Sequence, residues 1–417
     1  MTGPPSDIRD PAAWRLGEEE IAWARMHMPA MTALARRLGE RGLLAGRRIA
    51  VNLVLEPKTG ALVTALADAG AEMVVSCRAG TTRDEVAAAL DHAGIAVHAR
   101  SDSDAAADRA HALAAIDSRP DVLVDDGSSV LRLAHQERPD IVAGMVGATE
   151  ETTSGLRPLR VMVREGTLAV PVMAVNDARC KTLFDNGVGT AESCLTTILD
   201  LLDRPLAGAR VVVAGYGHVG RGMARAARAG GARVTVTEVD PVAALEAVVA
   251  GYDVAPLREA AAAADLVISA TGIAHTITVA DLMAMPDGAT VAVAGGVPEE
   301  AEIEAALAAG AVARQVRDAV ESLTLPGGPE VTVLDHGQCL NCTAGPGNPV
   351  EIMDLSFAVQ VAAIGLLLAD DGALGPGVHP LPAVVDEQVA AAKLAALGLR
   401  VDSASVAQRA FLAGWRA

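Results

Sequence analysis

Aromatic side chains are scarce in this sequence. Phe, Tyr and Trp together make up 2% of the 417 residues, so a folded core must be built mainly from Ala, Val, Leu and Ile. Hydrophobic residues account for 51% and charged residues for 21%, a balance typical of a globular chain rather than a disordered one. A chain of this length is too long for one small core and predicts two or more domains.

Positive charge is also in short supply. The sequence holds 34 Lys and Arg against 52 Asp and Glu, a formal net charge of −18, and no basic stripe runs along it. A polyanion would be repelled, so we expect no nucleic acid partner, and an acidic surface suits a cytoplasmic enzyme. We expect no cleavable leader. The longest apolar runs, such as residues 357–369 with Gln360 inside, are too short to cross a bilayer, so no membrane contact is expected.

Cysteine usage gives little support to disulfides. The five cysteines are an odd number and are scattered along the chain, which argues against a disulfide framework. Cys339 and Cys342 form a C-x-x-C motif, for which a redox pair or half of a metal site is one interpretation. Because no second ligand pair lies nearby, two buried thiols are the favoured interpretation, and no metal is expected.

Apolar runs alternate with helical patterns along the chain, which predicts an α/β fold with parallel sheets covered by helices on both faces. Asp125, Asp126 and Gly127 follow one strand-like run, at the end of a strand where such sheets place ligands. The expected strands are residues 48–55, 72–76, 95–98, 122–124 and 170–177. The expected helices are the first 45 or so residues, 59–69, 84–92, 186–203, 356–369 and the final part, with a turn-rich region at 150–155.

A dinucleotide-binding motif follows the strand-like run at residues 210–214. Gly215, Gly217 and Gly220 form G-x-G-x-x-G, and a helical pattern follows at 221–229. Gly215 permits the tight turn, Gly217 lets the backbone approach a pyrophosphate, and Gly220 allows close packing of helix on strand. The next strand-like run ends in Glu238, the expected place for an acid that binds the adenosine ribose hydroxyls. A carboxylate there would repel a 2′-phosphate, so the sequence predicts NAD rather than NADP.

Several motifs resemble those of S-adenosylhomocysteine hydrolases. The resemblance covers nearly the whole chain, in order and with near-constant spacing. The matching segments are Asn176-Asp177, Lys181 with Phe184-Asp185-Asn186, Asp125-Asp126-Gly127, the run from Glu150 to Gly155, the segment from Val213 through Pro241, Asn341, Ser356-Phe357 and Gly377-Val378-His379.

The resemblance implies two Rossmann-like doubly wound parallel-sheet domains and a short C-terminal helical segment. Residues 1–185 together with 349–380 would form a discontinuous substrate-binding domain, and residues 186–348 the NAD-binding domain. Residues 381–417 would be a C-terminal segment in contact with another subunit of a homodimer or homotetramer, which follows only by analogy.

The resemblance also implies an internal redox cycle. NAD oxidises a substrate hydroxyl to a ketone, the neighbouring C–H becomes acidic, the adjacent group leaves, water adds, and the hydride returns. Lys181 would be the base, which requires a lowered amine pKa, and Asp185 would position it. Glu151 would bind the sugar diol and Asp126 would handle the proton of elimination and water addition. NAD would also contact Thr152, Thr153, Ser154, Asn186, His218, Val219, Thr271, Gly295 and Asn341.

The scarcity of lysine supports this role for Lys181. The sequence has only Lys58, Lys181 and Lys393 and otherwise uses Arg for positive charge. Arg cannot usefully lose a proton, so a lysine kept between motif residues indicates a titratable amine. Chance survival of a surface lysine is the alternative.

The sequence departs from the family at positions that would recognise the substrate. Val54, Gly296 and Asn348 stand at family histidine positions, and Thr190 stands at a cysteine position. Glu56 and Lys58 replace residues that read adenine; with Thr59 and Asn348 they are expected to contact substrate. Lys58, Arg78 and Arg83 either bind a carboxylate or phosphate there or are solvated surface charges.

These departures leave three hypotheses. The first is an NAD-dependent enzyme that performs this chemistry, or part of it, on a nucleoside-like or other polar hydroxylated small molecule other than or modified from S-adenosylhomocysteine. This is favoured because changed polar groups no longer pair with the old substrate. The second is a genuine adenosylhomocysteinase that tolerates the missing histidines. The third is a non-catalytic NAD-binding regulatory protein, against which the retained Lys181 and Asp185 count.

Overall fold

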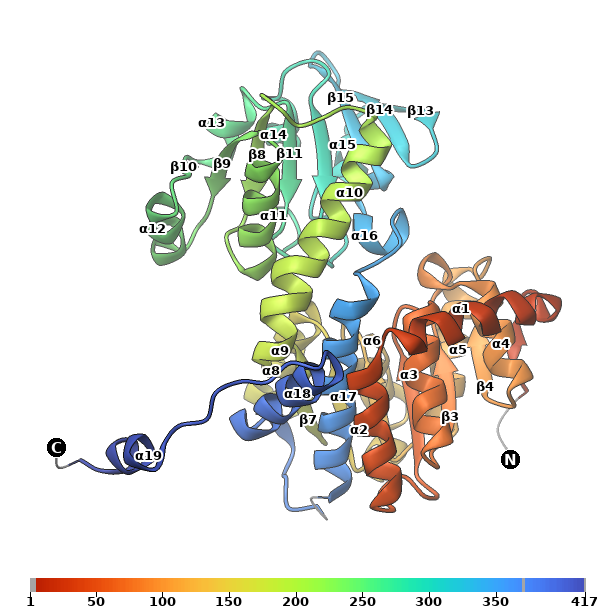
Figure 1. Cartoon of the computed structure of the whole chain (residues 1–417). Coiled ribbons are helices and arrows are strands. Elements are labelled where there is room, and N and C mark those ends of the chain that lie inside the picture. Colours follow the sequence, from red (N-terminus) through yellow and green to blue (C-terminus); the bar gives the residue numbers. More distant parts are fainter. Residues whose placement is uncertain (1–4, 370–371, 416–417) are drawn as a thin grey trace.

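The computed structural model describes residues 5–369 and 372–415. Two sheets, each covered by helices on both faces, lie one above the other in Figure 1. This arrangement confirms the predicted α/β class. Parts of the predicted domain ranges lie outside the described residues, namely residues 1–4, 370–371 and 416–417.

The first sheet is eight-stranded and parallel throughout. Its order is β1-β4-β3-β2-β5-β6-β7-β16, so the order reverses between β2 and β5, where open α/β sheets bind ligands. The strands are β1 (Asp7–Ile8), β2 (Arg48–Asn52), β3 (Glu72–Ser76), β4 (Ala96–Ala99), β5 (Val122–Asp125), β6 (Gly147–Glu150), β7 (Pro171–Ala174) and β16 (Gly377–Pro380). Its helices are α1 (Trp14–Met26), α2 (Pro29–Glu40), α3 (Pro57–Asp68), α4 (Asp84–His92), α5 (Ala105–Asp117), α6 (Ser129–Glu137), α7 (Pro139–Val142), α8 (Thr153–Glu165) and α17 (Val350–Ala369).

The second sheet has the order β10-β9-β8-β11-β12-β15-β14-β13, and its order reverses between β8 and β11. The strands are β8 (Arg210–Ala214), β9 (Arg233–Thr237), β10 (Asp253–Val254), β11 (Leu266–Ser269), β12 (Thr290–Val293), β13 (Val312–Arg317), β14 (Val320–Thr324) and β15 (Glu330–Leu334). The helices are α11 (His218–Ala229), α12 (Pro241–Val249), α13 (Leu257–Ala261), α14 (Val279–Leu282) and α15 (Ile303–Ala308).

One edge of the second sheet is antiparallel, which the sequence did not predict. β14 pairs antiparallel with both β13 and β15. Only a short turn joins each pair, and such turns can connect antiparallel strands but not a parallel crossover. The remaining pairs of this sheet are parallel, as expected.

Two long helices connect the sheets. The chain enters the second sheet through α10 (Thr190–Leu202) and returns through α16 (Leu340–Thr343) and α17. α17 begins at Val350, earlier than the predicted start at Ser356, so the expectation that no apolar segment reaches membrane-spanning length was wrong. However, 78% of its apolar window is buried within the protein, where it packs on α2 as the central helix of the first core.

Two other local expectations were wrong. Residues 150–155 are not a turn-rich region: β6 ends at Glu150 and α8 begins at Thr153, because the Thr152 side chain accepts a hydrogen bond from the Gly155 N–H and caps the helix. The N-terminal helix is two helices, since Pro29 begins α2 after a break at Met28.

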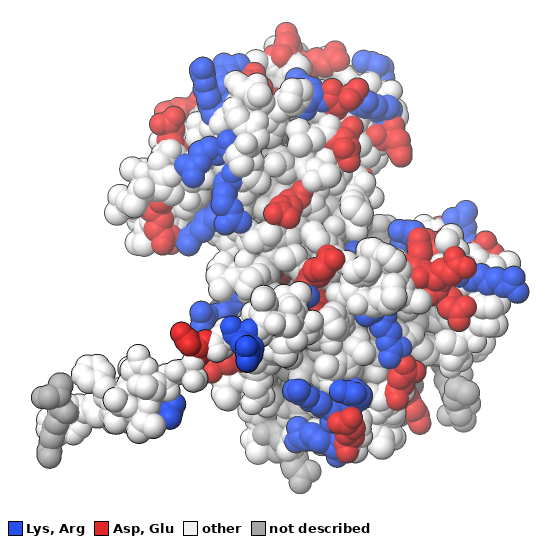
Figure 2. Space-filling model, viewed as in Figure 1, with Lys and Arg blue, Asp and Glu red and all other residues white. Residues whose placement is uncertain are grey.

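The C-terminal segment has two parts. α18 (Ala383–Ala396) packs on α17 and α2, whereas α19 (Val406–Ala413) protrudes from the body in Figure 1. On the face shown in Figure 2, acidic and basic side chains are interspersed over the body, and the protruding segment is almost free of charge. Phe411 and Leu412 of α19 are exposed. That this segment contacts another subunit stays a prediction.

Candidate active site

A cavity of about 600 Å³ lies between the carboxyl ends of the strands of both sheets. Segments that follow β2, β5 and β6 line it from the first sheet, and segments that follow β8, β11 and β12 line it from the second. Both points at which strand order reverses therefore open into one cavity. Such a position lets one sheet hold a cofactor and the other hold a substrate.

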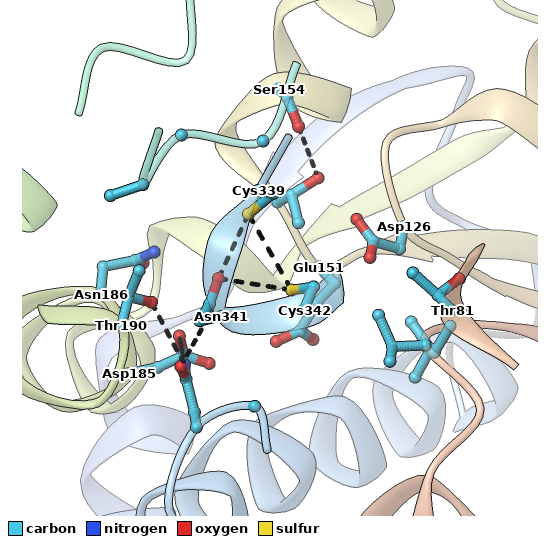
Figure 3. Close-up of a pocket in the computed structure, with 18 of the residues that line it drawn as sticks. Thr81, Asp126, Glu151, Ser154, Asp185, Asn186, Thr190, Cys339, Asn341 and Cys342 are labelled. Carbon is cyan, nitrogen blue, oxygen red and sulfur yellow. Dashed lines mark hydrogen bonds between the residues drawn. The ribbon is translucent and has the colours of Figure 1, made fainter. Parts of the chain in front are cut away.

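Most of the predicted site residues line this cavity, and ten of its residues are labelled in Figure 3. The predicted residues found there are Glu56, Thr59, Asp126, Glu151, Thr152, Thr153, Ser154, Lys181, Asp185, Asn186, Gly217, His218, Val219, Thr271, Gly295, Asn341 and Asn348. Four others do not line it. Gly215, Gly220 and Glu238 are not among its lining residues, and Lys58 lines a neighbouring cavity that shares Glu56.

A π-helical segment, Thr182–Gly189, positions the central lysine and its partners. The wider turn of a π-helix brings residues five apart together, and Lys181 Nζ donates to Asn186 Oδ1 at 3.2 Å. The same Nζ lies 3.5 Å from Asp185 Oδ1 and 3.9 Å from Glu151 Oε1. The Lys181 side chain is only 3% exposed, so its charge is compensated by protein groups rather than by water.

Helix α17 and the segment before it hold the two carboxylates. Ser356 Oγ donates to Asp185 Oδ2 at 2.7 Å, and Asn348 Nδ2 donates to Asp185 Oδ1 at 2.8 Å. Gln360 Nε2 donates to Glu151 Oε2 at 2.6 Å. Glu151 Oε1 is buried without a hydrogen-bond partner among the described residues. A buried oxygen of this kind is suited to accept a hydrogen bond from a bound ligand.

The electrostatics of the cluster correct one expectation. Burial lowers the pKa of the Lys181 ammonium, but the charges of Asp185, Glu151 and Asp126 outweigh burial and raise the pKa above its ordinary value. The expectation that the pKa of Lys181 is lowered, as a base requires, was therefore wrong. Burial raises the pKa of Glu151 to about 8 and also raises the pKa of Asp126. One cation stands among three carboxylates, so the cluster retains protons near neutral pH.

The glycine-rich turn fits a dinucleotide. Gly215 has φ +94°, and a Cβ on Gly220 would lie 1.9 Å from the Gly215 carbonyl oxygen, so both positions require glycine. A Cβ on Gly217 would meet nothing within 4 Å, which leaves open space in front of the backbone. α11 begins directly after Gly217, so its free N–H groups face that space. These features suit a pyrophosphate.

Glu238 lies at the end of β9, where the motif predicts it. Its carboxylate accepts hydrogen bonds from the backbone N–H groups of Tyr216 and Val239, each at 2.7 Å, and of Asp240 at 3.1 Å. These bonds fix an anionic group beside the glycine-rich turn. The donor set therefore fits NAD, whose ribose hydroxyls can donate to a carboxylate, better than NADP.

Val54, Gly296 and Asn348, which stand at family histidine positions, all line the cavity. Two charged side chains lie close to Gly347, next to Asn348 in the chain. Lys58 Nζ lies 2.6 Å from Glu56 Oε2 and donates to the Pro346 carbonyl at 3.2 Å. Burial raises the pKa of Glu56. The two substitutions thus form one buried ion pair rather than two independent readers of a base.

The sequence did not predict the functional contacts of four residues. Ser356 was matched as a motif only, and Gln360 was noted only as an interruption of an apolar run. That interruption was the available signal, since the side chain is fully buried and contacts Glu151. Cys342 and its neighbour Cys339 line the cavity and are half-buried, not fully buried as favoured. Within the described residues, no group of His, Cys, Asp and Glu is placed to hold a metal ion.

Fold and site together define a two-sheet dinucleotide-binding protein in which a glycine-rich turn and a buried Lys–carboxylate cluster share one cavity. Comparison with known proteins agrees. The family described as S-adenosyl-L-homocysteine hydrolase, NAD binding domain, matches residues 186–347. The adenosylhomocysteinase of Thermotoga maritima is 39% identical over 401 residues, which cover 96% of this chain and 99% of that protein.

Two further relatives match over a similar extent. The adenosylhomocysteinase of Gloeobacter violaceus is 40% identical over 402 residues, 96% of this chain and 94% of that protein. The S-inosyl-L-homocysteine hydrolase of Methanopyrus kandleri is 39% identical over 416 residues, 98% of this chain and 97% of that protein. The chain belongs to the S-adenosyl-L-homocysteine hydrolase family; it is an enzyme, and its cofactor is NAD.

Proposed function

We propose that this enzyme oxidises a hydroxyl of a nucleoside-like thioether to a ketone and thereby enables elimination and water addition at the adjacent carbons. We further propose that its substrate is other than or modified from S-adenosyl-L-homocysteine. The observation that carries the proposal is the buried Lys181–Asp185–Glu151 cluster in the same cavity as the glycine-rich turn. The first sheet then holds substrate and the second holds NAD.

Lys181 and Asp185 serve the hydroxyl that is oxidised. When bound, NAD would supply the hydride acceptor for the hydroxyl-bearing carbon and the hydride donor that restores it. Lys181 has one hydrogen-bonded partner, Asn186, and two nearby carboxylates, so its Nζ can reach a substrate oxygen without leaving the cluster. Because its pKa is raised, Lys181 accepts a proton only after a neighbouring negative charge is lost or a positive charge arrives.

Glu151 and Asp126 serve the rest of the sugar. The unpartnered Glu151 Oε1 accepts a hydrogen bond from a neighbouring substrate hydroxyl. Asp126 follows β5 at the cavity wall, and burial raises its pKa so that it holds a proton more readily than an ordinary carboxyl. A group of this kind can take a proton at elimination and return one at water addition.

The Glu56–Lys58 pair supports an altered substrate choice. A free carboxylate is a good acceptor for the amino group of adenine, but the Glu56 carboxylate is already paired with an ammonium 2.6 Å away. Lys58 lines the neighbouring cavity, so it acts on a bound base only through Glu56. Because the paired Glu56 carboxylate gives no strong preference for the amino group of adenine, we propose that an oxo-purine is accepted at least as well as adenine.

Arg78 is the candidate for a carboxylate of the substrate. Of the three cations at this end, Lys58 is paired with Glu56, and Arg83 forms ion pairs with Glu20 and Glu85. Arg78 lines the cavity and forms no ion pair within the described part of the chain. An unpaired guanidinium binds a carboxylate in a bidentate manner, as an amino-acid tail would require.

A genuine adenosylhomocysteinase is the second candidate, favoured by the relatives that carry that name. Turnover separates the two. The NAD-loaded protein is incubated with S-adenosyl-L-homocysteine and with S-inosyl-L-homocysteine, and the nucleoside and homocysteine are followed by mass spectrometry. Equal or faster cleavage of the inosyl compound supports an altered substrate choice. Cleavage of the adenosyl compound alone identifies the second candidate.

A further inference from the structure

Two thiols lie side by side in the wall of the cavity. Cys339 Sγ and Cys342 Sγ are 4.0 Å apart; Cys339 directly precedes the short helix α16, and Cys342 lies within it (Figure 3). Both side chains are half-buried and line the cavity, so a small molecule in the cavity can reach them. A disulfide has an S–S distance of about 2.05 Å, so the two sulfurs must approach by about 2 Å to form one.

A chain of hydrogen bonds connects these thiols to the catalytic cluster. Cys339 Sγ donates to Asn341 Oδ1 at 3.2 Å, and Cys342 Sγ to the same oxygen at 3.5 Å. Asn341 Nδ2 donates to Asn348 Oδ1 at 2.9 Å, and Asn348 Nδ2 donates to Asp185 Oδ1 at 2.8 Å. Ser193 and Thr190 also hold Asn348. Two S–H groups therefore face the Asn341 oxygen, and the Asn341 amide contributes through Asn348 to the position of Asp185.

We propose that Cys339 and Cys342 are a modification site, a dithiol that a low-molecular-weight disulfide converts to an intramolecular disulfide and thereby switches off the catalytic cluster. The Cys342 thiolate attacks the small disulfide RSSR, which forms a mixed disulfide and releases RS⁻. Cys339 then attacks the Cys342 sulfur, its proton goes to the departing thiolate, and the protein S–S bond forms. Two protein thiols and RSSR become one protein disulfide and two RSH.

The order of attack follows from the contact between the thiols. The single S–H of Cys339 can point either to Asn341 Oδ1 or to Cys342 Sγ. The contact with Cys342, together with burial, raises the pKa of Cys339 well above its ordinary value. Cys339 therefore keeps its proton, and the first attack falls to the other thiol, Cys342. The reaction accelerates as the pH is raised.

Disulfide formation changes the hydrogen bonding of Asn341. Neither sulfur of a disulfide carries a hydrogen, so the Asn341 oxygen loses both S–H donors. The amide orientation that presents the Asn341 NH₂ group to Asn348 is then no longer stabilised by the S–H hydrogen bonds. The support that Asn348 gives to Asp185 is then weakened, while the hydrogen bond from Ser356 to Asp185 remains. Displacement of a positioning group by about 1 Å can slow a reaction by about a hundredfold.

Disulfide formation can be tested without any assumption about the substrate, whereas the effect on activity rests on the proposed function. The full-length protein is treated with 2-hydroxyethyl disulfide at mildly alkaline pH and examined by intact-protein and peptide mass spectrometry. We expect a loss of the mass of two hydrogen atoms, with the crosslink between residues 339 and 342. No such loss, or a crosslink to Cys194, overturns the proposal.

Activity is then compared in matched variants, each against its own untreated sample. In the wild type, we expect substrate-driven reduction of the bound nicotinamide to fall about tenfold or more on oxidation and to return with dithiothreitol. Cys194→Ser, which removes the third thiol of this region, is expected to respond like the wild type, and Cys342→Ser is expected not to respond. An equal response in Cys342→Ser, or full activity of the crosslinked protein, contradicts the switch.

Discussion

Asn348 donates a hydrogen bond of 2.8 Å to Asp185, a residue 163 positions earlier in the chain. The bond joins the returning segment before α17 to the π-helical segment that carries the catalytic cluster. By resemblance, Asn348 stands where the family has a histidine. An amide therefore makes a direct contact to the carboxylate that positions Lys181, so loss of that histidine does not leave Asp185 unsupported.

Removal of this amide should slow the chemical step. Asn348→Ala leaves Asp185 with only the hydrogen bond from Ser356, and a hydrogen bond to a charged group contributes about 1.5–3 kcal/mol, a factor of roughly ten to a hundred. We expect kcat to fall by that factor while NAD remains bound. Gln408→Ala, on the exposed α19, is the control. An unchanged kcat in Asn348→Ala would remove Asn348 from the positioning set.

The glycines of the dinucleotide turn should separate binding from folding. A side chain at Gly217 meets open space, so Gly217→Val should fold normally yet exclude the pyrophosphate and weaken NAD binding by about a hundredfold or more. Gly220→Val places Cβ 1.9 Å from a carbonyl oxygen and should lower the melting temperature as well. NAD titration and thermal unfolding check both. Normal NAD affinity in Gly217→Val contradicts the assigned phosphate site.

The raised pKa of Glu151 should appear in the pH dependence of stability. Its pKa is about 8 in the folded protein against an ordinary value of 4.5. Between these values the folded state holds a proton that the unfolded chain has released, so stability contributed by Glu151 falls as pH rises through this window. Glu151→Gln should lessen the decline of melting temperature between pH 5 and 8. Glu40→Gln, at an exposed side chain, is the control, and parallel curves for all three proteins would contradict the raised pKa.

The arginines at the substrate end should not be equivalent. Arg78→Met removes the guanidinium that we assign to a substrate carboxylate, and KM should rise about ten- to a hundredfold with kcat little changed. Arg83→Met removes a cation that Glu20 and Glu85 already engage, so KM should change much less. The measurement is steady-state kinetics with whichever of the adenosyl and inosyl compounds is cleaved in the turnover assay. Equal effects of the two substitutions would contradict the distinction.

Local patterns in the sequence were sufficient for much of the fold and site. β3, β8 and α4 have the predicted bounds, because each is a compact apolar or amphipathic run with clear ends. The glycine-rich turn and the cluster around Lys181 were also found, because their residues are neighbours in sequence.

Contacts between distant segments could not be predicted in the same way. Gln360 reaches Glu151 across 209 positions, and no local pattern encodes that contact. The pKa of Lys181 depends on three carboxylates from three segments, so its direction was predicted wrongly. The scarcity of lysine was also less informative than expected, because all three lysines, not only Lys181, have little-exposed side chains. Lys58 and Lys393 form ion pairs at 2.6 and 2.8 Å.

The central claim is that Lys181 enables oxidation of a substrate hydroxyl by the bound cofactor. The most direct measurement is absorbance of reduced nicotinamide in a single turnover, with wild type and Lys181→Met loaded with NAD and mixed with the adenosyl and inosyl compounds in parallel. The account predicts reduction in the wild type with at least one compound, and a rate lower by about 10²–10⁴ in Lys181→Met with NAD still bound. Reduction at an equal rate in the variant, or no reduction by either compound in the wild type, would contradict it.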